Sequence, residues 1–341
     1  MKSIVLQKPE HLVFEEIDNP GKPNPNEALV KVLRIGICGT DIHAFKGRQP
    51  FFNYPRILGH ELGVEVVETG IAVNHLKAGD KCALEPYFNK TLGQAVRRGK
   101  TNCGEEISVF GVHEDGGMRP YFKVDANYLH PSEKLNFDQL ALIEPLAIGY
   151  HAVQRASPEQ DDKILVIGAG PIGMAAAQFA ILTNKQVVIM DINRQRLDVC
   201  QKHLALKGSL HIDNQDFNYP ENLKNIFDGD LPTVIFDATG NPDSMKKTLE
   251  FAAHGSKIVF IGLFQGDFIF HDPLFHKKEL TLMASRNALG NDFKEIIGLI
   301  ESGIVNTDFW ITHRINFEEL PEQFGGLFFG NEHVIKVMVE L

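Results

Sequence analysis

Three residues near the start of the chain have side chains that together could hold a metal ion. Cys38 offers a thiolate, and the adjacent pair His60 and Glu61 offers an imidazole and a carboxylate. Zinc in proteins is bound by these donor types, and a catalytic zinc keeps one coordination position open for substrate or water. The three residues therefore predict a catalytic Zn²⁺ site. The plain alternative is a buried cysteine near an ordinary histidine and glutamate in a loop.

Two further residues close to Cys38 could move a proton. Thr40 carries a hydroxyl two residues beyond the thiolate, and His43 carries an imidazole three residues later. A hydroxyl and a histidine in series can pass a proton from a substrate alcohol to water. We therefore expect Thr40 and His43 to be catalytic.

The elements that must position these side chains are β-strands. Residues 27–34 and 64–67 are β-rich runs bounded by glycine, proline and asparagine, and no long helical period occurs before about residue 138. This pattern predicts an irregular β-barrel or meander, with the metal ligands on its connecting loops.

A second pattern begins near residue 139. A helix is expected over 140–153, followed by a buried strand over 163–167, the glycine-rich turn 168–173, a helix over 174–182 and a strand over 186–190 that ends in Asp191. A strand, three spaced glycines, a helix, a second strand and an acidic residue form the dinucleotide-binding fingerprint. A purely structural glycine turn is the alternative. The candidate cofactor contacts are Gly168, Gly170, Pro171, Ile172, Gly173, Asp191 and Arg196.

The acidic residue indicates which dinucleotide binds. Asp191 lies 18 residues beyond Gly173, close to the spacing of the carboxylate that binds the ribose hydroxyls. Its charge would repel a 2′-phosphate, so NAD is favoured over NADP. Arg194 and Arg196 are near enough to leave NADP open.

Strands and helices continue to alternate after this fingerprint. Strands are expected over 233–238, 257–262 and, at a sheet edge, 280–284, with helices over 243–253 and around 293–300. The last strand, 334–339, is expected to return to the first domain. The fold class is therefore α/β, with a β-barrel domain beside a doubly wound parallel sheet.

Size and composition exclude several functions. A chain of 341 residues is long enough for two domains, and its net charge of −10 without a basic cluster argues against nucleic acid. No apolar run approaches a membrane helix, and the N-terminus has no signal-peptide core. Four scattered cysteines suit a reducing cytoplasm.

Several short motifs together carry a family resemblance. They are Gly-Ile-Cys-Gly-Thr-Asp-Ile-His at 36–43, Gly-His-Glu at 59–61, Asp-Gly-Gly at 115–117, Glu-Pro at 144–145 and the glycine turn. In this order they resemble the zinc-dependent medium-chain alcohol dehydrogenase superfamily, in its polyol and threonine dehydrogenase branch. The resemblance covers essentially the whole chain.

The resemblance implies a domain plan and a set of roles. A GroES-like catalytic domain would comprise residues 1–147, completed by 285–341, and a Rossmann domain would comprise 148–284, with the active site in the cleft between them. Cys38, His60 and Glu61 match the zinc ligands, and Thr40 and His43 match the proton relay. A homodimer or homotetramer would form through edge strands of the Rossmann sheet.

Glu144 matches a carboxylate that can join or replace a zinc ligand during turnover. The alternative is a surface or helix-capping glutamate before a proline.

The chain departs from the family pattern in two places. Many relatives bind a structural zinc through four cysteines, but here only Cys103 remains, and Asn89, Leu92 and Ala95 occupy the other positions. One cysteine cannot build a tetrahedral thiolate site, so we predict no structural zinc and a loop held by packing. Val64 replaces a family glycine after the metal ligands, which predicts a small local rearrangement.

The expected reaction is zinc-dependent, NAD-linked oxidation of a secondary alcohol of a sugar acid or polyol. His113, Arg286 and Asn287 are candidates to line the substrate site, and each could equally be structural. Another polyol, L-threonine or a deoxy-sugar acid is an alternative substrate. A zinc-free reductase and a non-catalytic NAD-binding regulator are the other readings.

Overall fold

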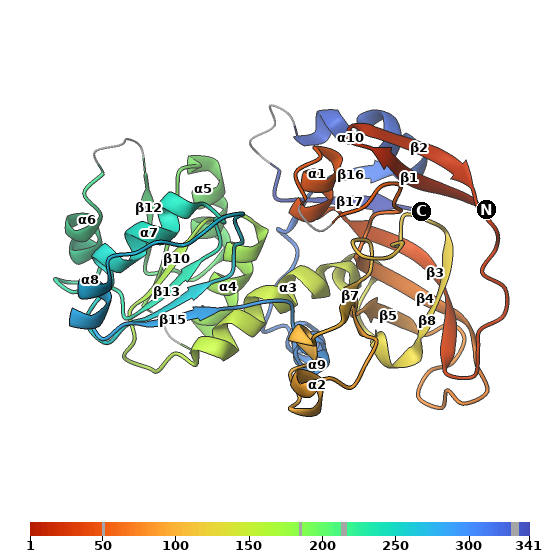
Figure 1. The fold of residues 1–341 in the computed structure, drawn as a ribbon, viewed down its shortest axis with the longest axis horizontal. Coiled ribbons are helices and arrows are strands. Elements are labelled where there is room, and N and C mark those ends of the chain that lie inside the picture. The colour runs from red at the N-terminus through yellow and green to blue at the C-terminus, as the bar shows by residue number, and fades with distance from the viewer. Residues whose placement is uncertain (50–51, 184–185, 213–216, 329–333) are drawn as a thin grey trace. The chain divides into compact units, whose positions relative to one another are not determined.

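The computed structural model describes residues 1–49, 52–183, 186–212, 217–328 and 334–341, and the chain forms two compact units (Figure 1). Unit 1 comprises Met1–Glu144 and Leu289–Leu341, and unit 2 comprises Pro145–Ala288. Among the helices of these described ranges, none is both long and apolar enough to cross a membrane.

Unit 1 is built around a seven-stranded sheet with the order β16-β17-β3-β4-β5-β9, in which β8 also pairs with β3. Alternate residues of β3 are buried, as expected for a strand with one face on a core. The strands are β3 (Glu27–Gly36), β4 (Glu61–Thr69), β5 (Lys81–Leu84), β8 (Tyr121–Asp125), β9 (Leu129–Pro131), β16 (Ile311–Asn316) and β17 (Lys336–Glu340).

Small hairpins, short helices and the start of α3 (Phe137–Ala156) complete the part of unit 1 that the structure describes. The N-terminal hairpin contacts the C-terminal helix α10, so the two ends of the sequence share one core. The hairpins are β1 (Lys2–Lys8) with β2 (His11–Glu16), and β6 (Tyr87–Asn89) with β7 (Ile107–Val109). The helices are α1 (Gly39–Phe45), α2 (Gln94–Arg97), α9 (Gly290–Glu301) and α10 (Leu320–Phe328), with short 3₁₀ turns at Thr101–Cys103, Ala126–Tyr128 and Phe317–Glu319.

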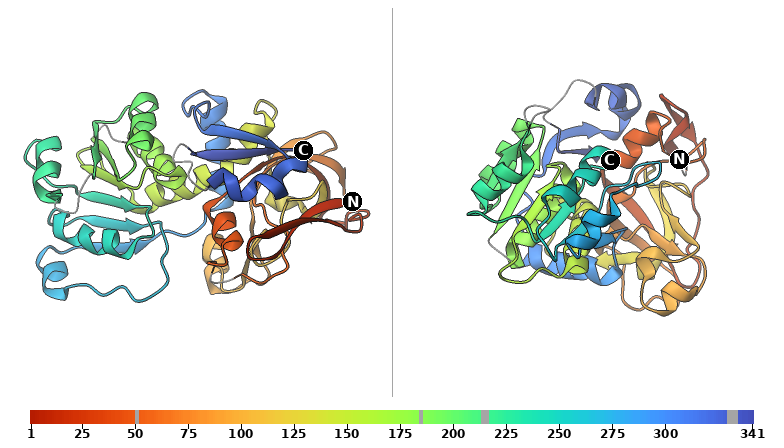
Figure 2. Two further views of the ribbon diagram at one scale, coloured as in Figure 1. Left: turned by 90° about the horizontal axis from the view of Figure 1, so that it is seen from above. Right: turned by 60° about the vertical axis from the view of Figure 1, so that its left-hand side comes forward.

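Unit 2 is a six-stranded parallel sheet with the order β12-β11-β10-β13-β14-β15. Figure 2 shows helices on both of its faces, which explains why β10 and β13 are buried at every position and apolar at every position except Asp237. The strands are β10 (Ile164–Ile167), β11 (Val187–Asp191), β12 (Gly208–His211), β13 (Val234–Asp237), β14 (Lys257–Phe260) and β15 (Thr281–Ala284). The helices are α4 (Pro171–Thr183), α5 (Arg194–His203), α6 (Tyr219–Ile226), α7 (Pro242–Phe251) and α8 (Asp272–Lys277).

The predicted α/β class is confirmed, including the doubly wound sheet and the edge position of β15. In unit 2, β12, α5, α6 and α8 were not predicted from the sequence. Strand β12 lies at the opposite edge and is only partly buried, and α5 is strongly polar, so neither carries a clear apolar period.

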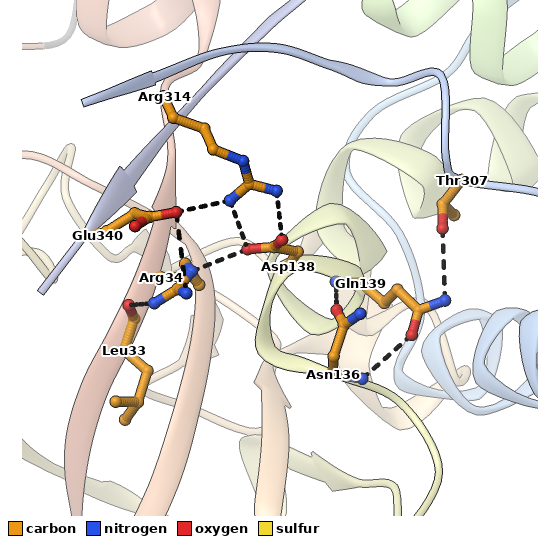
Figure 3. Close-up of polar contacts among 8 residues, drawn as sticks. All are labelled: Leu33, Arg34, Asn136, Asp138, Gln139, Thr307, Arg314 and Glu340. Atoms are coloured by element: carbon orange, nitrogen blue, oxygen red, sulfur yellow. Dashed lines mark hydrogen bonds and ion pairs between the residues drawn. The ribbon is translucent and has the colours of Figure 1, made fainter. Parts of the chain in front are cut away.

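Helix α3 (Phe137–Ala156) begins in unit 1 and ends in unit 2. It starts three residues before the predicted helix because Asn136 and Gln139 form a reciprocal cap. The Gln139 backbone N–H donates to the Asn136 side chain at 2.9 Å, and the Asn136 N–H donates to the Gln139 side chain at 3.0 Å (Figure 3). The helix contains Pro145, as the sequence predicts.

Candidate metal centre and dinucleotide-binding turn

The pairing of β3 with β4 brings the three candidate metal ligands together. Gly36, at the end of β3, pairs with Glu61, the first residue of β4. Cys38 follows β3, and one side-chain donor atom from each of Cys38, His60 and Glu61 lies within 4.8 Å of the other two. The expectation that all ligands lie on loops is therefore wrong for Glu61, which belongs to β4. Its position is fixed by the register in which β4 pairs with β3.

The Glu61 carboxylate is held by a buried lysine that sequence reasoning missed. Lys336 of β17 is only 2% exposed, and its Nζ donates to both Glu61 oxygens at 2.6 Å and to the Ile37 carbonyl at 3.2 Å. Burial disfavours the ammonium, but the negative charges of Glu61 and Cys38 outweigh it and raise the pKa of Lys336. The only sequence signal was one lysine within the apolar run 334–339.

Asp41 contacts two of the three candidate metal ligands and orients them. Its buried carboxylate accepts a hydrogen bond from the Cys38 N–H at 2.9 Å and lies 3.8 Å from Nδ1 of His60. Burial opposes a charge on His60, but the negative charges of Asp41 and Cys38 raise its pKa well above the usual value. In the sequence, Asp41 stands within the motif 36–43, but its residue type alone did not indicate this role.

The Asp-Gly-Gly motif clamps the backbone that carries His60. The N–H groups of Gly116 and Gly117 donate to the carbonyls of Ile57 and Gly59 at 2.7 and 2.8 Å. A Cβ on Gly116 would lie 2.5 Å from the Gly59 carbonyl oxygen, so only glycine permits this approach.

Glu144 is buried near the three ligands but is not part of their compact group. The Tyr87 hydroxyl donates a hydrogen bond to its Oε1. Burial raises the pKa of Glu144, while the charge of His60 works in the opposite direction. The alternative of a surface glutamate is thus excluded by burial.

An ion-pair network fixes the start of α3, the helix that carries Glu144, to two strands of unit 1 (Figure 3). Asp138 accepts hydrogen bonds from Arg34 of β3 at 2.8 Å and from Arg314 of β16 at 2.5 Å. Arg314 also donates to Glu340 of β17 at 2.7 Å. Through these contacts the elements that carry Cys38, Lys336 and Glu144 are held to one another.

The two candidate relay residues lie on α1. Thr40 is half-buried and His43 is exposed, and their spacing of three places them on the same side of the helix. Partial burial and the positive charges of Lys46 and Arg48 lower the pKa of His43. A neutral imidazole is the form that can accept a proton.

The candidate substrate-lining residues are spread over both units. His113 belongs to unit 1, where its Nδ1 accepts the Val109 N–H at 2.9 Å and so supports its own turn. Arg286 and Asn287 belong to unit 2, and Asn287 has a positive φ of 53°.

The glycine turn of unit 2 has the geometry of a dinucleotide site. Gly168 has a φ of 97°, and a Cβ on Gly173 would lie 1.7 Å from the Gly168 carbonyl oxygen. At Gly170 an added Cβ would meet only Nη1 of Arg196, at 3.7 Å, so the turn is open there for a ligand to approach the backbone. Pro171 and Ile172 begin α4.

Asp191 ends β11 beside this turn. One carboxylate oxygen accepts the Ala169 N–H, and the other accepts the Asn193 N–H at 2.7 Å. Arg194 is exposed and lies 3.5 Å from Asp198, whereas Arg196 lies against the glycine turn.

Hydrogen bonds hold the loop that was predicted to lack a structural zinc. The Glu105 carboxylate accepts the Ala95 N–H, and the Asn89 amide donates to the Thr101 carbonyl, both at 2.9 Å. Helix α2 buries none of its residues, and Leu92 is 76% exposed. Asn102 of the same loop is buried, so hydrogen bonds add to the packing that was expected to hold this loop.

The donor set of unit 1 fits zinc. It combines a thiolate, an imidazole and a carboxylate, and Nδ1 of His60 faces Asp41 without a hydrogen-bond partner among the described residues. A carboxylate behind a metal-binding histidine is a common way to orient the ring.

Known protein families match segments of both units. Residues 24–134 match the alcohol dehydrogenase GroES-like domain, and residues 171–302 match the zinc-binding dehydrogenase family. The chain is 41% identical to L-galactonate-5-dehydrogenase of Escherichia coli K12, over 99% of this chain and 98% of that protein. It is 32% identical to sorbitol dehydrogenase of Ovis aries, over 94% and 92%. A crystal structure of an alcohol dehydrogenase (RspB) from E. coli CFT073 with NADH superimposes with a TM-score of 0.91 at 27% identity, over 100% and 99% of the two chains.

Proposed function

Because this chain belongs to the zinc-dependent medium-chain alcohol dehydrogenase superfamily, we propose that it oxidises a secondary alcohol of a sugar acid with NAD, and that L-galactonate is its substrate. The observation that carries the proposal is the compact Cys38, His60 and Glu61 group in a chain 41% identical to L-galactonate-5-dehydrogenase. Sorbitol dehydrogenase, at 32% identity, makes a polyol the second candidate substrate.

Each part of the site has a role in this reaction. Cys38, His60 and Glu61 would hold one zinc per subunit, which would supply Lewis-acid polarisation of the substrate hydroxyl. Thr40 accepts the hydroxyl proton through a hydrogen bond, and His43, whose lowered pKa keeps it neutral, passes the proton to water. NAD, when bound, would supply the nicotinamide ring that accepts the carbinol hydride.

The cofactor is held by unit 2. The backbone of Gly168, Gly170 and Gly173 and the start of α4 bind the pyrophosphate, and Asp191 binds the ribose hydroxyls. Pro171 and Ile172 form the first turn of that helix, and Arg196 contacts the cofactor from beside Gly170. The enzyme acts in the cytoplasm as a homodimer or homotetramer.

The test is NADH formation across a panel of aldonates, polyols and L-threonine, with and without a chelator. Turnover of L-galactonate that is lost on zinc removal and restored by zinc is the expected result. A polyol or L-threonine as the best substrate would overturn the sugar-acid assignment and leave the dehydrogenase chemistry intact. Full activity in metal-free protein would refute the zinc mechanism, and inactivity with zinc and NAD both bound would favour a regulator.

A further inference from the structure

The Tyr87 hydroxyl holds Glu144, a buried carboxylate beside the candidate metal ligands. We propose that Tyr87 is a positioning residue: its hydroxyl keeps Glu144 away from the metal in the substrate-free enzyme and thereby keeps one coordination position open for the alcohol. The inference deepens the proposed function and rests on the zinc site of Cys38, His60 and Glu61.

The first support for the proposal is that Glu61 and Glu144 are bound by different kinds of hydrogen-bond donor. Glu61 and Glu144 are both buried, and each is engaged by a donor of the protein. Lys336 binds both oxygens of Glu61, which remains within the compact ligand group. Tyr87 binds Oε1 of Glu144, which lies outside that group. A neutral hydroxyl can retain a carboxylate without cancelling its charge.

The second support is that the Tyr87 ring is fixed from behind. It packs edge-on against Phe293 of α9, with ring centroids 6.3 Å apart and planes at 74°. Phe293 stacks on His130 with centroids 5.1 Å apart, and Nε2 of His130 is hydrogen-bonded to Oε2 of Glu85 at 2.9 Å. All of these side chains are buried, so the hydroxyl of Tyr87 occupies one place and cannot follow Glu144 if the carboxylate moves.

Without the Tyr87 hydroxyl, the buried Glu144 carboxylate would lack a hydrogen-bond donor. A buried charge that loses a hydrogen-bond donor is strongly driven to find another partner. Near Glu144 that partner would be the zinc, whose three protein ligands leave one position free. A fourth protein ligand would close this position, which is the arrangement of structural rather than catalytic zinc sites.

The experiment measures zinc affinity by competition with a chromophoric chelator in the full-length protein. Tyr87→Phe keeps the ring and removes only the hydroxyl, so we expect about tenfold tighter zinc binding, the factor that one lost hydrogen bond of this kind is worth. The double variant Tyr87→Phe/Glu144→Gln should lose this gain. Tyr128→Phe is the matched control, because its hydroxyl accepts the Asn89 N–H and does not contact Glu144. Unchanged or weaker zinc binding in Tyr87→Phe would overturn the proposal.

Cobalt substitution gives a second readout, and its Glu144→Gln arm does not require Tyr87→Phe to fold. If Glu144 is not a ligand at rest, Glu144→Gln should leave the ligand-field spectrum of the Co²⁺ enzyme unchanged, whereas Tyr87→Phe should alter it. A changed spectrum in Glu144→Gln would refute the inference.

These results are separable from a failure of the proposed function. Zinc that remains bound in Cys38→Ser would show that the assigned zinc site is wrong. Zinc that is lost in Cys38→Ser but bound equally by wild type and Tyr87→Phe would refute only the role of Tyr87.

Discussion

Gly36 shows how little space surrounds the metal ligands. A Cβ at this position would lie 2.1 Å from Oε2 of Glu61, the oxygen that Lys336 binds at 2.6 Å. Gly36→Ala should therefore push Glu61 out of the ligand group and weaken zinc binding about tenfold or more, since one charged hydrogen bond is worth that factor. Zinc affinity by chelator competition measures the effect.

A glycine in open space provides the control for this substitution. Gly298 lies within α9 of unit 1, and a Cβ there would meet nothing within 4 Å. Gly298→Ala should leave zinc affinity unchanged and slightly favour the helix. Equal zinc affinity in Gly36→Ala and Gly298→Ala would show that Glu61 can be accommodated elsewhere.

The candidate metal ligands could be predicted from the sequence because cysteine, histidine and glutamate are residue types that bind zinc. The residues that hold them could not. Lys336 is separated from Glu61 by 275 positions, and Tyr87 from Glu144 by 57, so only the tertiary structure brings each pair together. Asp41 stands within a recognisable motif, but its role depends on burial, which residue type alone does not give.

At the scale of elements, the network around Asp138 is what ties α3 to the sheet of unit 1. Asp138→Asn removes the charge that Arg34 and Arg314 share, and should lower the free energy of unfolding by about 1 kcal/mol at neutral pH. The value is small because Arg314 is 47% exposed and solvent screens its pair. Urea unfolding of the two proteins measures the difference.

This difference should depend on pH in a defined direction. Burial favours the protonated form of Asp138, but hydrogen bonds from Arg314 and Arg34 outweigh it and lower its pKa in the folded state. The stabilisation is therefore complete above about pH 4, the ordinary pKa of an unfolded aspartate, and is lost as the pH falls through the lower folded pKa. Asp308 is exposed in the same unit, so Asp308→Asn should change stability at no pH. A difference that persists undiminished in acid would contradict the assignment.

The segment between β6 and β7 provides a second test at this scale. Asn89 and Glu105 hold it through backbone hydrogen bonds, and Cys103 is its single cysteine. We predict one zinc per chain, unaffected by Cys103→Ser and abolished by Cys38→Ser, as measured by elemental analysis. Two zinc ions in the wild type and one in Cys103→Ser would refute the prediction.

Strong periodicity made the central strands of unit 2 predictable, whereas edge strand β12 and the cap of α3 were not. Strand β10 and the first three residues of β13 are continuously apolar because both faces of the sheet are covered, and both strands were predicted to within a residue or two. Edge strand β12 buries too little to leave a pattern, and α3 starts earlier than predicted because its Asn136 cap is polar.

At the scale of the whole molecule, the residues that we assign to zinc and those that we assign to NAD belong to different units. The candidate zinc ligands all belong to unit 1, and the glycine turn and Asp191 belong to unit 2, which has its own apolar core. A unit with its own core keeps its local geometry when a ligand of the other unit is removed. Chelation should therefore abolish dehydrogenase activity while NADH still binds, as fluorescence titration would show.

The converse experiment alters the proposed NAD site in unit 2 and measures the zinc content of the protein. Asp191→Ala removes the carboxylate that we assign to the ribose hydroxyls and should weaken NADH binding about tenfold, since it deletes charge-assisted hydrogen bonds. The Asp191 side chain contacts only the glycine turn and its own bend in the hydrogen bonds described above, so the zinc content should stay at one per chain. If chelation also abolished NADH binding, or if Asp191→Ala released zinc, the two sites would be coupled and the independence of the units would be refuted.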